Sequence, residues 1–197
     1  HFYLVTEVRR YSQHIFREII RSFKIETAFV PTCDEFFLSH ALDTTAETKR
    51  QAYFFVDGGD PDSPKLESAM EYRRAVAFDT RVIETVSASF VDNLPGRIQN
   101  GQVHVGHLNG EMVAVGMVLR NVLLAQHASI GMFTHESYRR MGIGTCTVLH
   151  LKRFCRKRDL VPLAGCGCEN TGSKSTLEAA GMVLATRLLR FEFRSEE

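Results

Sequence analysis

The stretch RRMGIGT, residues 139–145, is the most informative part of this sequence. It follows a segment typical of a strand, from about Gln126 to Thr134, and leads into a segment typical of a helix. Two glycines at a turn from strand to helix let the backbone approach a ligand closely. The first turn of a helix also presents unpaired N–H groups and a partial positive charge. The stretch therefore predicts an anion site suited to a pyrophosphate, to which Arg139 and Arg140 add charge.

Other interpretations of this stretch are excluded or stay open. No Gly-Lys-Ser/Thr follows it, which excludes a P-loop, and it holds a single G-x-G, which excludes a dinucleotide-binding fingerprint. A glycine turn ahead of a basic, solvated helix is the competing interpretation, because short glycine motifs often occur by chance. The same helix extends a basic face through Lys152, Arg153, Arg156 and Lys157.

Strands and helices are expected on both sides of the motif. The pair Asn109-Gly110 between two alternating runs is a strong hairpin signal, because both turn positions need positive φ. Asp79 is a natural cap for an amphipathic helix, which Pro95 and Gly96 end. The predicted series is a strand over 71–78, a helix over 82–91, hairpin strands over 102–108 and 111–120, a strand over 126–134, a helix to about 158, a strand over 161–168, a helix over 173–180 and a closing strand.

The first part of the chain has a separate α/β pattern. An apolar stripe from Val8 to Phe23 predicts a helix capped at Thr6. Residues 57–64 predict a solvated linker, because their glycines and prolines block both helix and strand. Between these segments we expect a strand over 25–30, a helix with the capping box Thr32 and Glu35, a short polar helix with the capping box Thr44 and Glu47, and a strand over 52–56.

Composition excludes several classes of protein. The chain has 197 residues, of which 44% are hydrophobic and 24% are charged, and its formal net charge is +1. This apolar content is enough for a core and excludes a mainly disordered chain. No apolar run approaches the roughly 18 residues of a membrane-spanning helix, so no membrane partner is expected. The near-zero net charge gives no reason to expect nucleic acid as a partner.

The five cysteines favour a reducing, cytoplasmic location. Their number is odd and too small for a disulfide framework, so we expect free thiols. Cys166 and Cys168 form a C-x-C pair, but no second pair completes the four ligands that zinc needs, so no metal is expected. The chain opens at His1 rather than at a methionine, so we expect residues upstream of it, and what remains shows no signal-peptide pattern.

The motif resembles motif A of the GNAT superfamily of N-acetyltransferases, written Q/R-x-x-G-x-G/A, with Arg139, Gly142 and Gly144 at its fixed positions. A second similarity lies downstream and a third lies upstream, and the three occur in the family's order. The predicted elements also follow the family's order, so the resemblance covers about residues 69–197. The second similarity consists of Asn170, Ser173, Leu177, Gly181 and Met182, and the third of Tyr72, Arg73, Arg74, Ala75 and Asp79.

The resemblance implies an α/β (α+β) fold. Its central sheet would be mixed and mostly antiparallel, flanked by helices and splayed between its fourth and fifth strands. We expect this GNAT-like acyltransferase core over residues 69–197, preceded by an N-terminal α/β extension over residues 1–68. The apolar stripes of the extension predict packing against either the core or a partner chain, and a homodimer is one such arrangement.

The resemblance also implies acetyl-CoA as a co-substrate, bound in the splay between these strands. The family pairs pantetheine with the fourth strand and holds the pyrophosphate on the N–H groups of the motif. An amine then attacks the thioester directly, and the protein orients it, removes its proton and stabilises the oxyanion. The cofactor-binding residues implied in this chain are Met132, Phe133, Thr134, Arg139, Arg140, Met141, Gly142, Ile143, Gly144, Thr145, Asn170 and Ser173.

Two positions depart from the family's pattern. The tyrosine that often protonates the departing thiolate would fall at Leu177, which cannot donate a proton. A carboxylate that some members carry on the fourth strand would fall near Ala128, so the adjacent His127 is the candidate catalytic base. The alternative for His127 is an ordinary half-exposed strand residue. His104 and His107 are weaker candidates.

The sequence therefore predicts an acetyl-CoA-dependent N-acetyltransferase that acts on the amine of a small molecule or an amino-acid-like substrate. The missing tyrosine leaves open a non-catalytic acyl-CoA-binding sensor or scaffold. Binding of nucleic acid by the basic helix is a third hypothesis, but the phosphates of CoA would explain those charges equally well.

Overall fold

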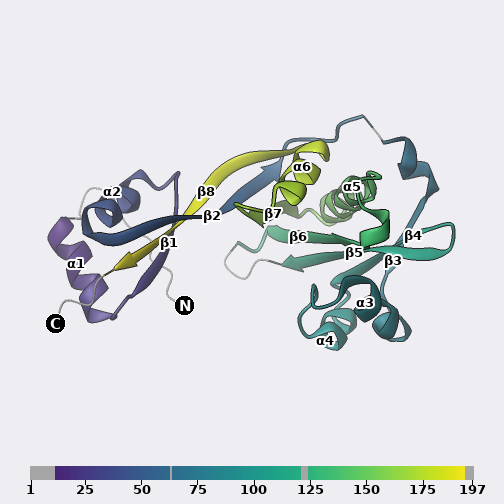
Figure 1. The fold of residues 1–197 in the computed structure, drawn as a ribbon, viewed down its shortest axis with the longest axis horizontal. Coiled ribbons are helices and arrows are strands. Elements are labelled where there is room, and N and C mark those ends of the chain that lie inside the picture. The colour runs from purple at the N-terminus through teal and green to yellow at the C-terminus, as the bar shows by residue number, and fades with distance from the viewer. Residues whose placement is uncertain (1–11, 63, 121–123, 194–197) are drawn as a thin grey trace. The chain divides into compact units, whose positions relative to one another are not determined.

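The computed structural model describes residues 12–62, 64–120 and 124–193 (Figure 1). Its strands form a sheet of eight in the order β1-β8-β2-β7-β6-β5-β4-β3. The chain divides into two units, residues 1–53 with 186–197 and residues 54–185, and each is described by itself. The elements are α1 (Gln13–Ser22), β1 (Thr27–Pro31), α2 (Glu35–Thr44), β2 (Thr45–Asp57), the short 3-10 helix η2 (Lys65–Ala69), β3 (Met70–Arg74), η3 (Ala77–Asp79), α3 (Thr80–Ser87), α4 (Leu94–Gln99), β4 (Val103–Leu108), β5 (Glu111–Arg120), β6 (His127–Thr134), η4 (Glu136–Tyr138), α5 (Ile143–Arg156), β7 (Val161–Gly167), α6 (Thr171–Ala179) and β8 (Met182–Phe193).

The unit of residues 54–185 is built on the strands from β3 to β7. The strands β3, β4, β5 and β6 pair antiparallel in chain order, and β7 then pairs with β6 in parallel. The hairpin between β4 and β5 turns at Asn109 and Gly110, whose φ angles of 52° and 82° confirm the predicted turn. This mixed, mostly antiparallel sheet confirms the predicted fold class.

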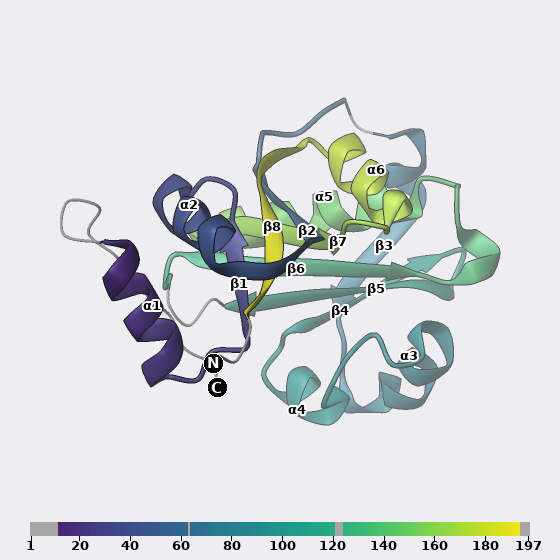
Figure 2. The ribbon, with the colours of Figure 1, turned by 60° about the vertical axis from the view of Figure 1, so that its left-hand side comes forward.

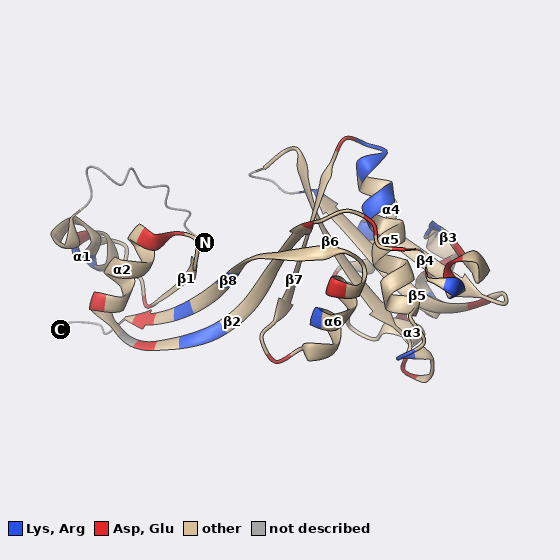
Figure 3. Ribbon diagram, turned by 90° about the horizontal axis from the view of Figure 1, so that it is seen from above, with Lys and Arg blue, Asp and Glu red and all other residues tan. Residues whose placement is uncertain are grey.

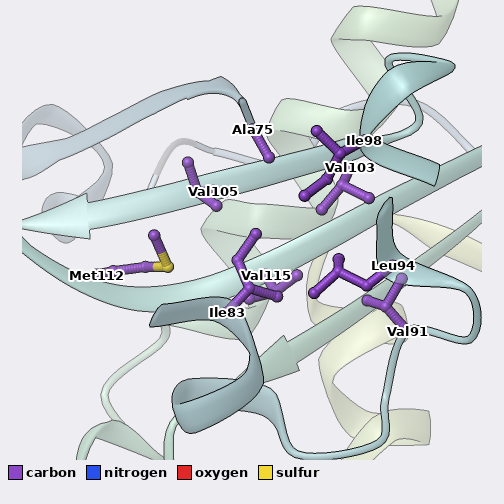
Figure 4. Close-up of a cluster of buried hydrophobic side chains, with 9 residues drawn as sticks. All are labelled: Ala75, Ile83, Val91, Leu94, Ile98, Val103, Val105, Met112 and Val115. Atoms are coloured by element: carbon purple, nitrogen blue, oxygen red, sulfur yellow. The ribbon is translucent and has the colours of Figure 1, made fainter. Parts of the chain in front are cut away.

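Helices cover both faces of this sheet. Figures 1 and 2 both show α5 and α6 on one face and α3 and α4 on the other. The sequence does not predict α4, because Pro95 and Gly96 are expected to end a helix. Pro95 lies instead in the first turn of α4, where its missing N–H has no partner to lose. The buried cluster under α3 and α4, drawn in Figure 4, consists of Ala75, Ile83, Val91, Leu94, Ile98, Val103, Val105, Met112 and Val115.

The other unit contains α1, α2, β1 and the last part of β8. β1 pairs antiparallel with β8, so that Val30 lies opposite Leu189. α2 begins after Asp34, whose carboxylate accepts a hydrogen bond of 2.9 Å from the Phe37 N–H, so Asp34 caps this helix instead of Thr32. The predicted cap of the first helix, Thr6, lies outside the described residues. The buried cluster of this unit consists of Phe16, Ile20, Val30, Ala41, Phe191 and Phe193.

Residues 45–57 form one long strand, β2, so the prediction of a short polar helix after Thr44 is wrong. The Thr45 hydroxyl donates to the backbone carbonyls of Glu47 and Glu192, at 2.7 Å and 2.9 Å. Both bonds favour an extended chain at this point. Placement in the sheet therefore outweighs the local capping pattern of Thr44 and Glu47.

Residues 58–62 of the loop after β2 are exposed, as the predicted solvated linker requires, but the loop is also anchored to α5. The ammonium group of Lys152 on α5 is fully buried. It lies 3.0 Å from Asp57 and 3.4 Å from Asp60. It also donates hydrogen bonds to the carbonyls of Gly59 and Ala180. One lysine thus joins the loop, the helix α5 and the end of α6.

Two arginines of α5 complete this ion network. Figure 3 colours Lys and Arg blue and Asp and Glu red along the chain. Arg156 binds Asp57 at 2.7 Å and Asp60 at 2.9 Å. Arg153 binds Asp60 at 3.1 Å and also pairs with Glu67. Three acidic residues from the end of β2 to η2, Asp57, Asp60 and Glu67, are therefore held by one face of α5.

The two units divide the chain differently from the predicted domains. The sequence places the boundary after residue 68, whereas the structure groups residues 54–68 with the core. The reason is that β2 lies next to β7 in the sheet and the loop after β2 is bound to α5. The end of β8, from residue 186, groups with the N-terminal segment because it pairs with β1.

Candidate functional site

A cleft opens where β6 and β7 separate. The two strands pair only over residues 127–130 and 161–164. Beyond this point β6 continues to Thr134 and stays paired with β5, so it is β7 that diverges. The cleft at this opening has a volume of about 790 Å³. The predicted splay between the fourth and fifth strands of the core is therefore confirmed.

The turn into α5 forms one wall of the cleft. Gly142 precedes the helix with a φ of +84°, a conformation that favours glycine. A Cβ on Gly144 would lie 3.0 Å from Cγ2 of Thr176 and 3.4 Å from Oγ1 of Thr134. The N–H of Cys146 bonds to the Gly142 carbonyl, and the N–H groups before it have no acceptor within the helix. The turn thus forms a cradle that can hold an anionic group. A side chain at position 144 would occupy part of this cradle.

The start of α6 forms the facing wall. The Asn170 side chain caps this helix, because its oxygen accepts a hydrogen bond of 3.0 Å from the Ser173 N–H. Both residues line the cleft. The cap fixes the orientation of the Asn170 amide, so this wall carries polar groups in defined positions.

Most of the residues predicted to bind the cofactor line this cleft, and two do not. The side chain of Met141 is half exposed and is not part of the lining. Ile143 is buried in an apolar cluster with Cys146 and Val113. These two positions therefore contribute only backbone to the turn. The predicted residues that line the cleft are Met132, Phe133, Thr134, Arg139, Arg140, Gly142, Gly144, Thr145, Asn170 and Ser173.

The strand β6 presents different residues to its two faces. Met132 points toward α5, since a Cβ on Gly144 would lie 3.6 Å from its sulfur. Side chains alternate along a strand, so Gly131 and Phe133 face the side of α3 and α4. Phe90, which follows α3, meets them there. Its ring lies 5.8 Å from the ring of Phe133, and a Cβ on Gly131 would lie 3.5 Å from its Cζ.

The sequence analysis missed Phe90 as a site residue. This residue belongs to the apolar stripe of the predicted helix over 82–91, and such residues are normally core. It does pack on the cluster of Figure 4, but it also lines the cleft. Its second role follows from where β6 lies in the sheet, and the periodicity of the helix carries no information about that.

Few titratable side chains reach the cleft. The Tyr138 hydroxyl donates to the Glu111 carboxylate at 2.7 Å, and this hydrogen bond raises the pKa of Tyr138. Burial raises the pKa of the Cys166 thiol. Leu177 lines the cleft, as the departure from the family's tyrosine implies. Among the described lining residues there is no aspartate, glutamate or histidine.

The structure does not bring His127 to the cleft. This residue begins β6 opposite Val161, where the two strands still pair, and the cleft lining starts further along at Ile130. It is half-buried, and its Nδ1 has no hydrogen-bond partner among the described residues. This position agrees with the alternative of an ordinary strand residue.

The weaker candidates His104 and His107 also lie outside the lining of the cleft. His104 is buried, and its Nδ1 lies 3.1 Å from Nε2 of His150 on α5. Burial lowers the pKa of His104 to about 3 and that of His150 to about 4. Both rings are therefore neutral near pH 7, and they belong to the interior of the fold.

Most of the basic face of α5 is engaged within the protein. Lys152, Arg153 and Arg156 are held by the loop residues Asp57 and Asp60. The phosphates of CoA are therefore not needed to explain the charges of these three residues. The reason is that the loop after β2 supplies their counter-charges.

The described residues give two further findings. They include no group of three or more His, Cys, Asp or Glu that could hold a metal ion. They also include no helix that is both long and apolar enough to cross a membrane.

Comparison with known families agrees with this geometry. Residues 66–182, more than half of the chain, match the model described as "Acetyltransferase (GNAT) family". The chain therefore belongs to the GNAT family of acetyltransferases. Residues 1–58 match a second model, described as "Acetyltransferase (GNAT) domain", so the N-terminal segment also has a counterpart among GNAT proteins. A search of curated protein sequences gave no match.

Solved structures share the fold at low sequence identity. A GNAT acetyltransferase from Colwellia psychrerythraea is 19% identical with a TM-score of 0.82, over 98% of this chain and 76% of that one. A GCN5-related N-acetyltransferase from Kribbella flavida is 13% identical with a TM-score of 0.64, over 93% and 76%. YncA of Salmonella typhimurium, solved with its cofactor acetyl-CoA, is 14% identical with a TM-score of 0.51, over 65% and 96%.

Proposed function

We propose that this acyltransferase is an acetyl-CoA-dependent N-acetyltransferase, which transfers an acetyl group directly to the amine of a small molecule or an amino-acid-like substrate. The observation that carries the proposal is the cleft between β6 and β7, bordered by the glycine turn at the start of α5. This arrangement joins an extended groove to an anion cradle, and acetyl-CoA has the same two parts, an extended arm and a pyrophosphate.

In this proposal each wall of the cleft has its own task. The unpaired N–H groups at the start of α5, together with Arg140, hold the pyrophosphate. The backbone of β6 at Met132 and Thr134 pairs with the pantetheine arm, because β7 has left this edge of β6 free of strand pairing. Asn170 and Ser173 contact the same arm from α6. Acetyl-CoA supplies the acetyl thioester.

The protein's contribution to the reaction is mainly orientation. The cleft places an amine against the acetyl carbonyl, and such positioning alone accelerates a bimolecular step strongly. The C–N bond forms, the C–S bond breaks, the amine loses a proton and the thiolate gains one. The described lining holds no carboxylate or imidazole to accept the amine's proton. In this proposal the amine therefore loses its proton to water, and the thiolate takes one from water. The rate is then expected to follow the fraction of acceptor that is neutral.

All five cysteines are free thiols, and all lie in described segments. Free thiols persist in a reducing compartment. They support a cytoplasmic location as part of this proposal.

The test combines binding and turnover. Acetyl-CoA at millimolar concentration should raise the Tm, and addition of a suitable amine should release the CoA thiol, which a thiol reagent detects. Absence of any Tm shift would refute the proposal. A Tm shift without thiol release across a broad amine panel would favour the second candidate, a non-catalytic acyl-CoA sensor. The observation behind that candidate is Leu177 at the position of the family's tyrosine.

A further inference from the structure

The cleft connects two chemically different faces of the sheet. On the face of α5 and α6 it is lined by the glycine turn and the polar groups of Asn170 and Ser173. On the face of α3 and α4 it is lined by the aromatic side chains of Phe90 and Phe133. Figure 2 shows these helix pairs on opposite sides of β6. If acetyl-CoA occupies the first face, as the proposed function requires, the acceptor approaches from the second.

The aromatic face is fixed in place. The Phe90 N–H donates to the Ser87 carbonyl at 3.0 Å, which holds the turn after α3. The side chain packs on the apolar cluster beneath α3 and α4 together with Val86 and Met117. The Phe90 ring also lies against Gly131 of β6, where an added Cβ would be 3.5 Å from its Cζ, an ordinary contact distance. This face is a preformed apolar surface next to the opening between the strands.

The charged side chains that line the cleft in the described structure are those of Arg139 and Arg140. The guanidinium of Arg139 lies 5.5 Å from the centre of the Phe133 ring. Its counter-charge, Glu136, is 3.4 Å away, but both side chains are more than half exposed, so the pair is weak. Among the described residues that line the cleft, arginines are present and carboxylates are not. The nearby carboxylates, Glu111 and Glu136, already bind Tyr138 and Arg139, so a second positive charge on the acceptor would meet the arginines without a carboxylate in the lining to balance it.

We infer that the acceptor is a hydrophobic amine with no second positive charge, and that Phe90 and Phe133 select its apolar group. This inference rests on the proposed function and narrows its substrate. Arylalkylamines are the simplest members of this class, and polyamines and aminoglycosides lie outside it. Phe90 is a specificity-determining residue in this account, since it contacts the acceptor's apolar group and none of the reacting atoms.

The experiment compares phenethylamine with spermidine by release of the CoA thiol from the full chain. We expect kcat/KM for phenethylamine to exceed that for spermidine by at least about tenfold, because an apolar contact discriminates by about 10- to 200-fold. Phe90→Ala should lose most of this preference and keep the Tm shift with acetyl-CoA. The matched control is Phe78→Ala, since Phe78 is 95% exposed on η3 and should change neither value.

The outcomes separate this inference from the proposed function. A Tm shift with acetyl-CoA and faster turnover of spermidine would overturn the inference and leave the N-acetyltransferase proposal standing. A Tm shift with turnover of neither amine would also overturn it. No Tm shift at all would refute the proposed function itself. If Phe90→Ala does not fold, the preference for phenethylamine over spermidine is measured in Phe90→Leu and in the unchanged protein. A lack of this preference in the unchanged protein would overturn the inference.

Discussion

The two ends of α5 carry similar basic residues and use them in opposite ways. At the start of the helix, Arg139 and Arg140 border an open cleft beside unpaired N–H groups. Further along, Lys152 and Arg156 are bound by the carboxylates of the loop after β2. The sequence presents both groups as one continuous basic face. The comparison shows that a cationic helix face does not by itself indicate a ligand, because the fold can supply the counter-charges, as Asp57 and Asp60 do for Lys152 and Arg156.

The largest effect is expected when the ion network between α5 and the loop after β2 is broken. Lys152→Met removes the fully buried ammonium and leaves Asp57 and Asp60 without their central partner. Loss of one partner of a buried pair costs about 3–5 kcal/mol, so the free energy of unfolding in urea should fall by that amount. Lys174→Met, which removes an exposed pair with Glu178, should cost about 0.5 kcal/mol or less. Equal losses in the two variants would contradict a central role for Lys152.

The same network changes the pKa of Asp57. Burial by itself would raise the pKa of this carboxyl, but hydrogen bonds from Arg156, the Gly59 N–H and Lys152 outweigh burial and lower it. A carboxyl with a lowered folded-state pKa contributes stability above its unfolded value, which is lost as the pH falls. This contribution to the free energy of unfolding should be weaker in Lys152→Met.

A loss of stability of about 4 kcal/mol is expected in acid from the buried histidine pair His104 and His150. The folded-state pKa values of His104 and His150, about 3 and about 4, lie below the ordinary value of 6.5. Between pH 6.5 and pH 4 the unfolded chain binds more protons than the folded one, so stability falls as the pH falls. From pH 7.5 to pH 5, urea unfolding should show a loss of about 2 kcal/mol for each of the two histidines, or about 4 kcal/mol in total. His104→Leu should have a shallower pH dependence, and an unchanged slope would count against buried neutral rings.

A smaller effect distinguishes the two kinds of arginine. Arg140→Gln should weaken acetyl-CoA binding by about fivefold, since one exposed charge contact is worth about 1 kcal/mol. Arg156→Gln should leave the Kd within about twofold, because this residue is engaged by Asp57 and Asp60. Calorimetric titration measures both values. Equal weakening in the two variants would mean that the whole basic face binds the ligand.

The smallest effect is expected at His127. Because this residue lies outside the cleft lining, His127→Gln should leave kcat/KM within about twofold at every pH. The rate should rise with pH until the acceptor amine is neutral, in the variant and in the unchanged protein alike, because the described lining holds no imidazole or carboxylate. A pH-dependent limb of the rate that is present in the unchanged protein and disappears in the variant would restore His127 as the base.

Sequence reasoning predicted the elements and the site where the signal is local. The Asn109-Gly110 turn and the glycines at 142 and 144 have conformational or spatial requirements that few residues meet, and the structure confirms the turn and the separation of the strands beside the motif. The prediction fails where tertiary context decides. Thr44 and Glu47 form a capping pattern, yet the chain continues into β2 because the sheet has a place for it beside β7.

The missed site residue has the same explanation. Phe90 lies in a helical apolar stripe, and its contact with Phe133 depends on the position of β6 relative to α3. Likewise, the acidic residues of the loop after β2 pair with α5 across almost a hundred positions of the sequence, as with Asp57 and Arg156. No local pattern in the sequence encodes such pairs. The sequence therefore predicts only a basic helix face and a separate linker, and not the contact between them.

Acetyl-CoA binding at the start of α5 is the central claim, and calorimetric titration of a matched pair of glycine variants tests it most directly. Gly142 and Gly110 have nearly equal φ angles, 84° and 82°, and neither has an atom within 4 Å of an added Cβ. Gly142→Glu and Gly110→Glu therefore impose similar strain and the same charge, one at the cleft and one at the β4–β5 hairpin. The account predicts that the unchanged protein and Gly110→Glu bind acetyl-CoA with similar Kd, whereas Gly142→Glu gives no binding heat at concentrations that saturate the other two. Equal binding by all three proteins, or no binding by the unchanged protein, would contradict it.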